Sequence, residues 1–188
     1  MRPGEPIPSH GDRYALAVAR PDTALAEHVC LAIVAEGATH GWAVARLLAP
    51  DAEVGRIWTL SRPLTYRALD QLVSDGLVDR RGSEPGRGRN RTILAATPLG
   101  RRRSRRWLDL PVEHVRDVRT ELLVKLELRQ RRGLDRRPLL EAQQAAFAPL
   151  LERLEDTEGD DGSDLVALWR RESAETVSRF LAAALDRS

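Results

Sequence analysis

The chain has 188 residues, of which 42% are hydrophobic and 31% are charged, and its formal net charge is +2. This length allows one or two domains with a real core. The longest apolar run, VCLAIVA at 29–35, is too short to span a bilayer, and the first residues lack the apolar block of a secretion signal. We therefore expect a cytoplasmic protein without a membrane partner. The only cysteine, Cys30, lies in that run, which excludes an internal disulfide and favours a buried structural thiol.

Residues 1–21 contain four prolines and little periodicity, so we expect a flexible N-terminal arm. The apolar pattern that follows predicts a helix over about residues 24–36, capped by Asp22 or Thr23 and ended by Gly37. His28 precedes the apolar run and is expected to be packed or to cap, rather than to bind a metal.

The next stretch, THGWAVARLLAP, predicts a second short helix with Thr39 as its cap and Pro50 at its end. Residues 51–60 are expected to form a loop, in which RIWTL is a candidate short strand. Trp42 and Trp58 are expected to fill the core of this region.

A period of about 3.6 residues in SRPLTYRALDQLVSDG, at 61–76, predicts a third helix, with Pro63 in its first turn and Gly76 after its end. One flank should face the core and comprises Leu64, Thr65, Ala68, Leu69, Leu72 and Val73. The other flank comprises Arg67, Asp70, Gln71 and Ser74, with Tyr66 on the seam. A polar flank alone is typical of any solvated helix, so the neighbouring segments must decide its role.

After Gly76 the period changes to about 2. LVDRR and RTILAA are predicted strands joined by the hairpin tip GSEPGRGRN, and TPLG opens a further helix with Thr97 as cap and Pro98 at its first position. Three short helices followed by a hairpin predict a winged helix–turn–helix. Its third helix would be the recognition helix, since the major groove of DNA admits a helix.

Charge is concentrated in the same region. Residues 80–106 carry 10 basic groups and 1 acidic group, a net +9, whereas residues 1–79 carry 7 and 10 and residues 107–188 carry 13 and 17. A local excess of this size is typical of a surface that binds a polyanion. Of the arginines at 101–106 only one or two are expected to contact phosphate, because the others must face elsewhere on the helix.

Beyond Trp107, at the expected domain junction, the pattern is helical. A helix that Gly133 ends is predicted by Val112, Val115, Val118, Leu122 and Leu126. The next predicted helix, RPLLEAQQAAFAPLLERLE, should be kinked or divided by Pro149. The last predicted helix spans 164–186, and its apolar stripe is expected to build a dimer through Val166, Trp169, Val177 and Phe180.

The expected fold is thus mainly α with a small β-wing. It comprises an N-terminal winged helix–turn–helix DNA-binding domain over residues 22–107 and a C-terminal helical dimerisation and effector domain over 108–188.

In HGWAVARLL, SRPLTYRALDQLVSDGLVDRR and TPLGRRR the chain resembles the PadR family of transcriptional regulators, and its helical remainder resembles the longer C-terminal domain of the first subfamily. His40 and Gly41 match the family motif that opens the second helix, and Tyr66 matches its recognition-helix tyrosine. The resemblance implies a homodimeric repressor on an inverted-repeat operator, relieved by a small molecule or a stress signal. Arg67 stands where the family often has proline, as one of several departures around 61–67 that imply a different operator.

The donor groups of Arg67 and Gln71 suit guanine and adenine edges respectively. Arginines of the wing can follow a backbone or enter a minor groove. The residues expected at the DNA are Thr39, His40, Arg62, Tyr66, Arg67, Gln71, Arg87, Arg89 and Arg91. Trp169 and Trp107 are candidates for stacking against a small-molecule effector, with packing in a dimer core as the favoured alternative for Trp169.

The sequence contains no P-loop, no GxSxG elbow and no metal-spaced set of Cys and His. We therefore expect no enzyme, no catalytic residue and no cofactor. His114 with Glu113 and Asp117 is more typical of a solvated helix surface than of a metal site. The alternative function is a winged-helix protein-interaction module without specific DNA binding, whose acidic C-terminal domain binds a partner.

Overall fold

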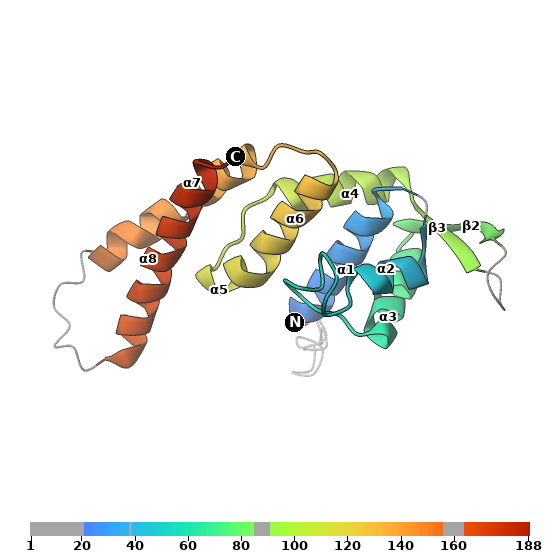
Figure 1. The fold of residues 1–188 in the computed structure, drawn as a ribbon, viewed down its shortest axis with the longest axis horizontal. Coiled ribbons are helices and arrows are strands. Elements are labelled where there is room, and N and C mark those ends of the chain that lie inside the picture. Colours follow the sequence, from blue (N-terminus) through green and yellow to red (C-terminus); the bar gives the residue numbers. More distant parts are fainter. Residues whose placement is uncertain (1–20, 38, 85–90, 156–163) are drawn as a thin grey trace, which may run out of the picture.

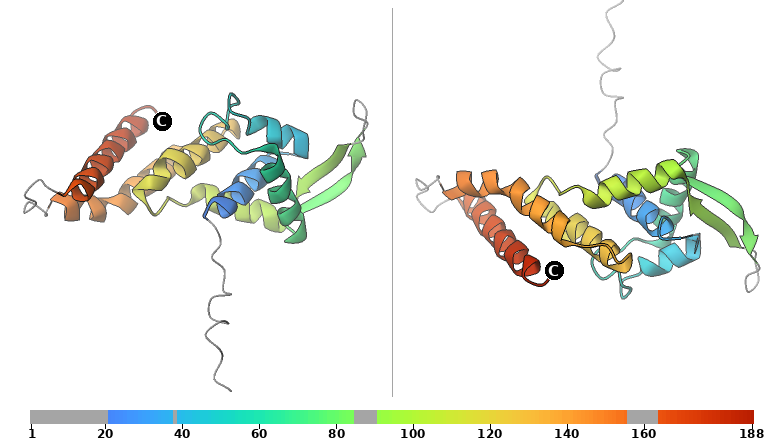
Figure 2. Two further views of the ribbon diagram at one scale, coloured as in Figure 1. Left: turned by 90° about the horizontal axis from the view of Figure 1, so that it is seen from below. Right: turned by 90° about the horizontal axis from the view of Figure 1, so that it is seen from above.

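The computed structural model describes residues 21–37, 39–84, 91–155 and 164–188. The described chain is elongated, with a winged helix–turn–helix and its projecting hairpin at one end and a pair of long helices at the other (Figures 1 and 2). The predicted fold class, mainly α with a small β-wing, is confirmed. Among the described helices, none has the length and apolarity needed to cross a bilayer.

Three helices surround the first core: α1 (Pro21–Val34), α2 (Gly41–Leu47) and α3 (Arg62–Ser74). Helix α1 begins before the predicted start, so Asp22 and Thr23 lie within it rather than ahead of it. Helix α3 agrees with the prediction. It has Pro63 in its first turn, and Gly76 follows its end with φ 67°, a conformation that glycine adopts without strain.

The wing is an antiparallel hairpin of β2 (Val78–Glu84) and β3 (Arg91–Ala96), as predicted. A third strand, β1 (Thr39–His40), pairs with the other edge of β3, with Thr39 opposite Leu94. The strand proposed for RIWTL is wrong, because that segment forms turns and a bend. A two-residue strand such as β1 carries no alternation of its own, and it forms only because β3 offers a free edge.

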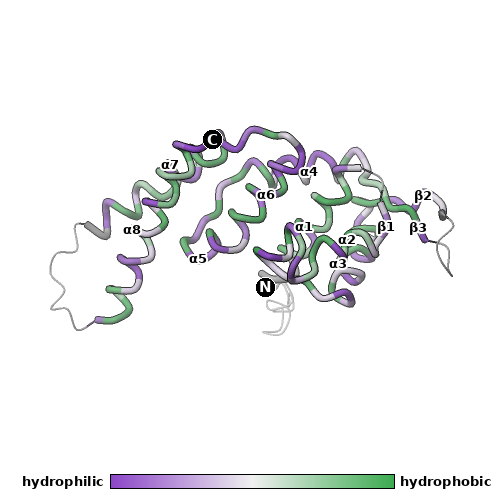
Figure 3. Tube along the Cα trace, viewed as in Figure 1, coloured by the Kyte–Doolittle hydropathy of each residue, from purple (hydrophilic) through white to green (hydrophobic). Residues whose placement is uncertain are grey.

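The first core is filled by aliphatic side chains of α1, α3 and the wing, with Val29, Leu72 and Val78 almost completely buried. Cys30 is fully buried, as predicted, and burial raises the pKa of its thiol to about 12. Figure 3 shows the contrast between the hydrophobic α1 and the hydrophilic α4 (Pro98–Asp109), which follows the wing. Thr97 caps α4 as predicted, since its Oγ1 accepts from the Gly100 N–H at 3.0 Å.

The C-terminal region begins with one continuous helical run. It comprises α5 (Val115–Asp117), a π-helical turn η1 (Val118–Leu122) and α6 (Leu123–Arg131). Gly133 follows its end with φ 63°, in agreement with the predicted stop. Two long helices complete the chain, α7 (Arg137–Glu155) and α8 (Leu165–Leu185). Helix α7 continues through Pro149, so of the two predicted outcomes, a kink or a division, the division is wrong.

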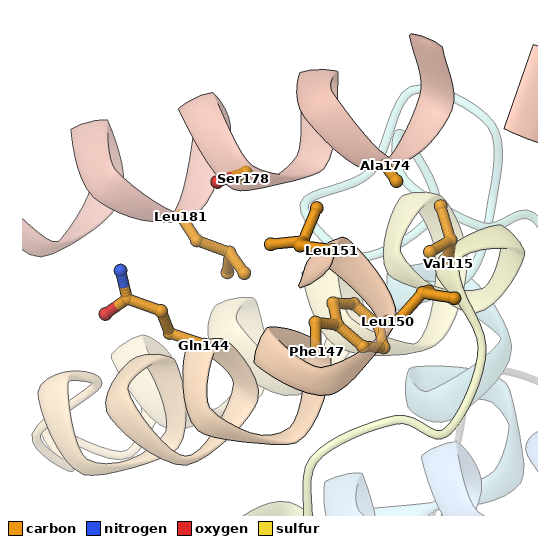
Figure 4. Close-up of a pocket in the computed structure, with 8 residues that line it drawn as sticks. All are labelled: Val115, Gln144, Phe147, Leu150, Leu151, Ala174, Ser178 and Leu181. Atoms are coloured by element: carbon orange, nitrogen blue, oxygen red, sulfur yellow. The ribbon is translucent and has the colours of Figure 1, made fainter. Parts of the chain in front are cut away.

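Helices α7 and α8 pack together over a second core that includes Leu122, Phe147 and Leu181. Figure 4 shows side chains of α7 and α8 lining a small cavity between them, with a volume of about 10 Å³. That volume suits at most one water, so this cavity offers no room for an organic ligand. Buried Gln143 connects α7 to the loop between α4 and α5, because its side chain accepts from the Val112 N–H at 2.7 Å and donates to the Val112 carbonyl at 3.0 Å.

Helix α6 returns to the winged helix–turn–helix and contributes Val124 and Leu128 to the first core. Its charged side chains reinforce this packing. Arg131 donates to both carboxylate oxygens of Glu36, at 3.1 and 2.9 Å, and Glu127 accepts from Arg56 at 2.8 Å. These contacts join residues more than seventy positions apart, so α6 fastens the C-terminal helices to the winged helix–turn–helix.

Trp107 is buried in the first core, beside α6. His28 stacks on its ring with the centroids 5.2 Å apart, and its indole N–H donates to Glu121 at 2.9 Å. Lys125, the only lysine of the chain, is buried with its Nζ 2.7 Å from Glu121 and 5.1 Å from the Trp107 centroid. His28 is therefore packed, as predicted, and the contacts of Trp107 give it a structural role.

This stack predicts a pH-dependent stability. Burial, together with the charges of Arg103 and Lys125, lowers the pKa of His28 to about 4, with Glu121 acting in the opposite direction. In the unfolded chain His28 has its ordinary pKa of about 6.5, so below this pH its imidazole is protonated in the unfolded chain but still neutral in the folded one. The folded protein therefore loses stability as the pH falls from about 6.5 towards about 4.

Because His28 is partly exposed, we expect a loss of only about 1 kcal/mol between about pH 7 and about pH 5. Urea denaturation at both pH values measures it. His28→Phe keeps an aromatic ring against Trp107 without the titrating group, so its stability should fall less over this interval. Equal losses in the two proteins would contradict the assignment to His28.

Candidate nucleic-acid interface

Helix α3 presents one polar face to solvent. Thr65, Ala68, Leu69 and Leu72 are buried, whereas the predicted DNA-contacting side chains of this helix are all exposed, namely Arg62, Tyr66, Arg67 and Gln71. Leu64 was predicted to face the core but is 49% exposed, because it lies at the edge of the buried flank. The helix therefore has the free face that a recognition helix requires.

Two contacts affect the charge of this face. Asp70 would repel a phosphate, but its carboxylate accepts from Arg80 of β2 at 2.7 Å, which offsets that charge and joins the helix to the wing. Gln71 donates to the Asp75 carboxylate at 2.8 Å, a contact that it would have to break to use the same amide N–H on a base. Arg67 lies about one turn before Asp70 and Gln71, with its side chain exposed.

Helix α2 is capped by His40, not by Thr39. The Nδ1 atom of His40 accepts from the Ala43 N–H at 3.1 Å and caps the helix. Thr39 was the predicted cap, but it is held in β1 opposite Leu94. Gly41 then permits close contact with α3, since a Cβ at this position would lie 2.7 Å from Cε1 of Tyr66. Tyr66 lies on the seam, as predicted, with 42% of its surface exposed.

Trp42 does not fill the core, contrary to the prediction, and is 38% exposed. The guanidinium carbon of Arg46 lies 5.2 Å from its ring centroid, and that of Arg91 lies 5.1 Å away. Arg91 Nη1 is also 3.2 Å from His40 Nε2. We call these four residues the Trp42 cluster. Sequence reasoning missed it, because Arg91 enters from β3 and no local pattern pairs it with Trp42. Trp58, by contrast, packs partly buried against the first core.

The basic segment after the wing is spread around α4. Ser104 is buried and Arg101 donates to the Ala96 carbonyl at 2.6 Å, while the remaining arginines of 101–106 are exposed. Only some of the arginines of α4 can therefore face the same phosphate backbone, as expected. Arg87 and Arg89, predicted to contact DNA from the wing tip, lie outside the described residues.

Three residues of the predicted dimerisation stripe, Trp169, Val177 and Phe180, line a groove between α8, α7 and the α5–η1 turn, with a volume of about 1210 Å³. Val177 and Phe180 are half-buried against the second core. Val166 and Trp169 lie nearer the start of α8 and are 58% and 73% exposed. Two of the four stripe residues are therefore covered only in part by the described chain.

His114, which the sequence places near Glu113 and Asp117, is exposed and lines the same groove. In the described part of the chain no group of three or more His, Cys, Asp or Glu side chains is arranged to hold a metal ion.

The helices, the sheet order and the free face of α3 define a winged helix–turn–helix with a C-terminal helical region. No protein-family model matches the chain, and no curated protein matches its sequence. Among solved structures it is similar to PadR of Bacillus subtilis in complex with operator DNA, with 18% identity, a TM-score of 0.44, and coverage of 86% of this chain and 96% of that chain.

The chain is also similar to Bacillus subtilis PadR in complex with p-coumaric acid, with 18% identity, a TM-score of 0.41, and coverage of 89% and 97%. A third similar structure is smu.1604c of Streptococcus mutans UA159, with 15% identity, a TM-score of 0.40, and coverage of 85% and 98%. The two Bacillus subtilis structures belong to the family that the sequence motifs resemble, and at these identities the likeness concerns the fold.

Proposed function

We propose that this protein is a DNA-binding regulator of transcription rather than an enzyme. The observation that carries the proposal is the free polar face of α3, with Arg62, Tyr66, Arg67 and Gln71 exposed beside a wing and helix whose residues 80–106 carry a net charge of +9. A helix with such a face fits the major groove, and the flanking arginines fit the phosphates on either side. Such a regulator would act in the cytoplasm.

Within α3, Arg67 is the best placed to read a base. It is exposed and, within the described structure, it forms no ion pair, and a guanidinium can bind both acceptors of a guanine edge. Gln71 is one turn further along and would exchange Asp75 for an adenine edge. The sequence preference would then depend mainly on these two side chains, while the wing supplies contacts common to all sequences.

We further propose that the active form is a homodimer joined through the groove beside α8. A second copy is the occupant that fits, because the exposed Val166 and Trp169 of one protomer can cover the same groove of the other in a twofold arrangement. Two winged helices held about 34 Å apart would engage the two halves of an inverted repeat. A small apolar effector that entered beside Trp169 would alter this spacing and so release the operator. The protein would then act as a repressor that a ligand relieves.

Electrophoretic mobility shift on genomic fragments, including the promoter of the protein's own gene, tests the function. We expect one or a few fragments to be bound in preference to competitor DNA. Binding should weaken steeply with salt, and about six phosphate contacts per dimer would give a log–log slope of about −5. The slope can be measured by fluorescence anisotropy on the bound fragment.

A slope near zero, or no preference among fragments, would contradict specific DNA binding. It would favour the protein-interaction module, in which the basic segment has no part in recognition. Capture of a partner by the C-terminal region alone would then be the next experiment.

A further inference from the structure

The contact between His40 and Arg91 cannot be a hydrogen bond while His40 caps α2. A ring nitrogen that accepts a hydrogen bond carries no proton, and in a neutral imidazole the other nitrogen then carries it. Since Nδ1 of His40 accepts from the Ala43 N–H at 3.1 Å, Nε2 is a donor. Arg91 Nη1, 3.2 Å away, is also only a donor. Two N–H groups thus converge with no acceptor between them.

The other tautomer does not remove the conflict. It would place a protonated Nδ1 against the Ala43 N–H and give up the cap, so one of the two contacts lacks an acceptor in either form. The conflict disappears when an external atom that only accepts hydrogen bonds lies beside both donors. An anionic oxygen is such an atom, and it also attracts the guanidinium charge.

A second cation, Arg46, also lies over the ring of Trp42. Both guanidinium groups of the Trp42 cluster lie near its ring, at 5.1 and 5.2 Å from the centroid, within the range of a cation–π interaction. Within the described chain neither Arg46 nor Arg91 forms an ion pair with a carboxylate. The ring therefore holds two guanidinium groups, each about 5 Å from its centroid, in a half-exposed position. Among the described side chains, neither group has a carboxylate partner.

The location identifies the anion. Gly41, between His40 and Trp42, packs under the ring of Tyr66 on the recognition helix. Arg91 is the first residue of β3, the second strand of the wing. The Trp42 cluster thus lies where α2, α3 and the wing meet, beside the face proposed to enter the major groove. The anion that reaches this place is a backbone phosphate at the edge of that groove.

We propose that His40 Nε2, Arg46 and Arg91 form a binding site for one backbone phosphate of DNA, and that Trp42 is the positioning residue that holds the two guanidinium groups for it. This inference builds on the proposed function and adds Arg46 and Trp42 to the expected contacts. A phosphate oxygen accepts from both His40 and Arg91, which satisfies the two converging donors. The site fixes the register of the protein on DNA and reads no base.

The test uses the full-length protein and a bound duplex in which neutral methylphosphonates replace single phosphates, one position at a time. For the wild-type protein, one position per half-site should lower affinity by about tenfold, as expected for loss of a charge-assisted contact. His40→Asn is the sharpest variant, because asparagine can still cap α2 but places no donor where Nε2 lies. It should bind the unmodified duplex more weakly and lose most of the methylphosphonate effect at that one position.

Trp42→Leu tests positioning. It changes no charge, so the salt dependence should stay close to that of the wild type, while the methylphosphonate effect at the same position should fall. A merely structural role for Trp42 would weaken binding without altering the response to that one phosphate. Arg187→Ala, which removes a cation at the far end of the chain, is the control and should behave as wild type.

Two outcomes would overturn the proposal. If every methylphosphonate position has the same effect on His40→Asn and on the wild type, DNA binding stands but this site does not. If the wild-type protein prefers no duplex at all, the proposed function fails as well. Circular dichroism at the assay temperature establishes that each variant is folded before its affinity is compared.

Discussion

Trp169→Glu is expected to convert the protein from a dimer to a monomer and to lower operator affinity by about 100-fold or more, because two linked half-site contacts become one. Trp169 is the most exposed aromatic side chain in the described structure, and it borders the groove between α7 and α8. Burying a tryptophan removes about 150–250 Å² from water, at about 25 cal/mol per Å². A glutamate loses this contribution and places a charge in the proposed dimer interface.

Sedimentation velocity measures the oligomeric state, and anisotropy measures operator affinity. Ala182→Glu is the matched control, because it introduces the same charge at an exposed position of α8 that does not line the groove. It should remain a dimer. If Trp169→Glu also remains a tight dimer with unchanged affinity, the protomers meet elsewhere, with the helical run from Val115 to Leu126 as the next surface to test.

A point substitution is a better test than removal of α8. The structure shows that Leu181 is fully buried in the second core and that Val177 and Phe180 pack against that core. A chain ending before α8 would expose this core, and loss of dimerisation would then be indistinguishable from partial unfolding. The exposed Trp169 can be changed without opening the core.

Much of the winged helix–turn–helix could be predicted because its signals are local. The Pro63 and Gly76 boundaries of α3, the Thr97 cap of α4 and the hairpin of β2 and β3 all follow from side chains within a few residues of the feature they set. The free face of α3 followed in the same way from a spacing of 100° per residue. These predictions depended on no contact between distant segments.

Three of the failures involve distant segments. Strand β1 forms because β3, more than fifty residues later, has an unpaired edge. Trp42 has an apolar ring, which led to the core prediction, but two arginines of separate elements make a half-exposed position favourable. Helix α6 belongs partly to the first core through Val124 and Leu128, although the composition after Trp107 suggested a separate helical region. No period or spacing within one segment contains this information.

Gly100→Ala is expected to destabilise the protein by about 3 kcal/mol, at the upper end of what overpacking usually costs. A Cβ at Gly100 would lie 2.1 Å from the Leu77 carbonyl oxygen and 3.0 Å from the Leu77 carbonyl carbon. Both are backbone atoms, so a change of side-chain rotamer cannot relieve the clash. The first turn of α4 would have to move away from the start of β2.

That movement would also displace the wing. The Thr97 N–H donates to the Leu77 carbonyl at 3.0 Å and its hydroxyl donates to the Gly76 carbonyl at 2.9 Å, so the turn that precedes β2 is held by the residue that caps α4. Operator affinity should therefore fall even at temperatures where the variant remains folded, because the wing no longer lies at its normal angle to α3.

Urea denaturation gives the stability change, and Gly37→Ala provides the control. A Cβ at Gly37 would meet no atom within 4 Å, so the same glycine-to-alanine change there should alter stability by only about 0.5 kcal/mol. Equal stability of the two variants would mean that α4 can slide along the wing at little cost. The close approach at Gly100 would then have no part in setting the angle between wing and recognition helix, and that angle would depend on the Arg80–Asp70 pair and the hairpin alone.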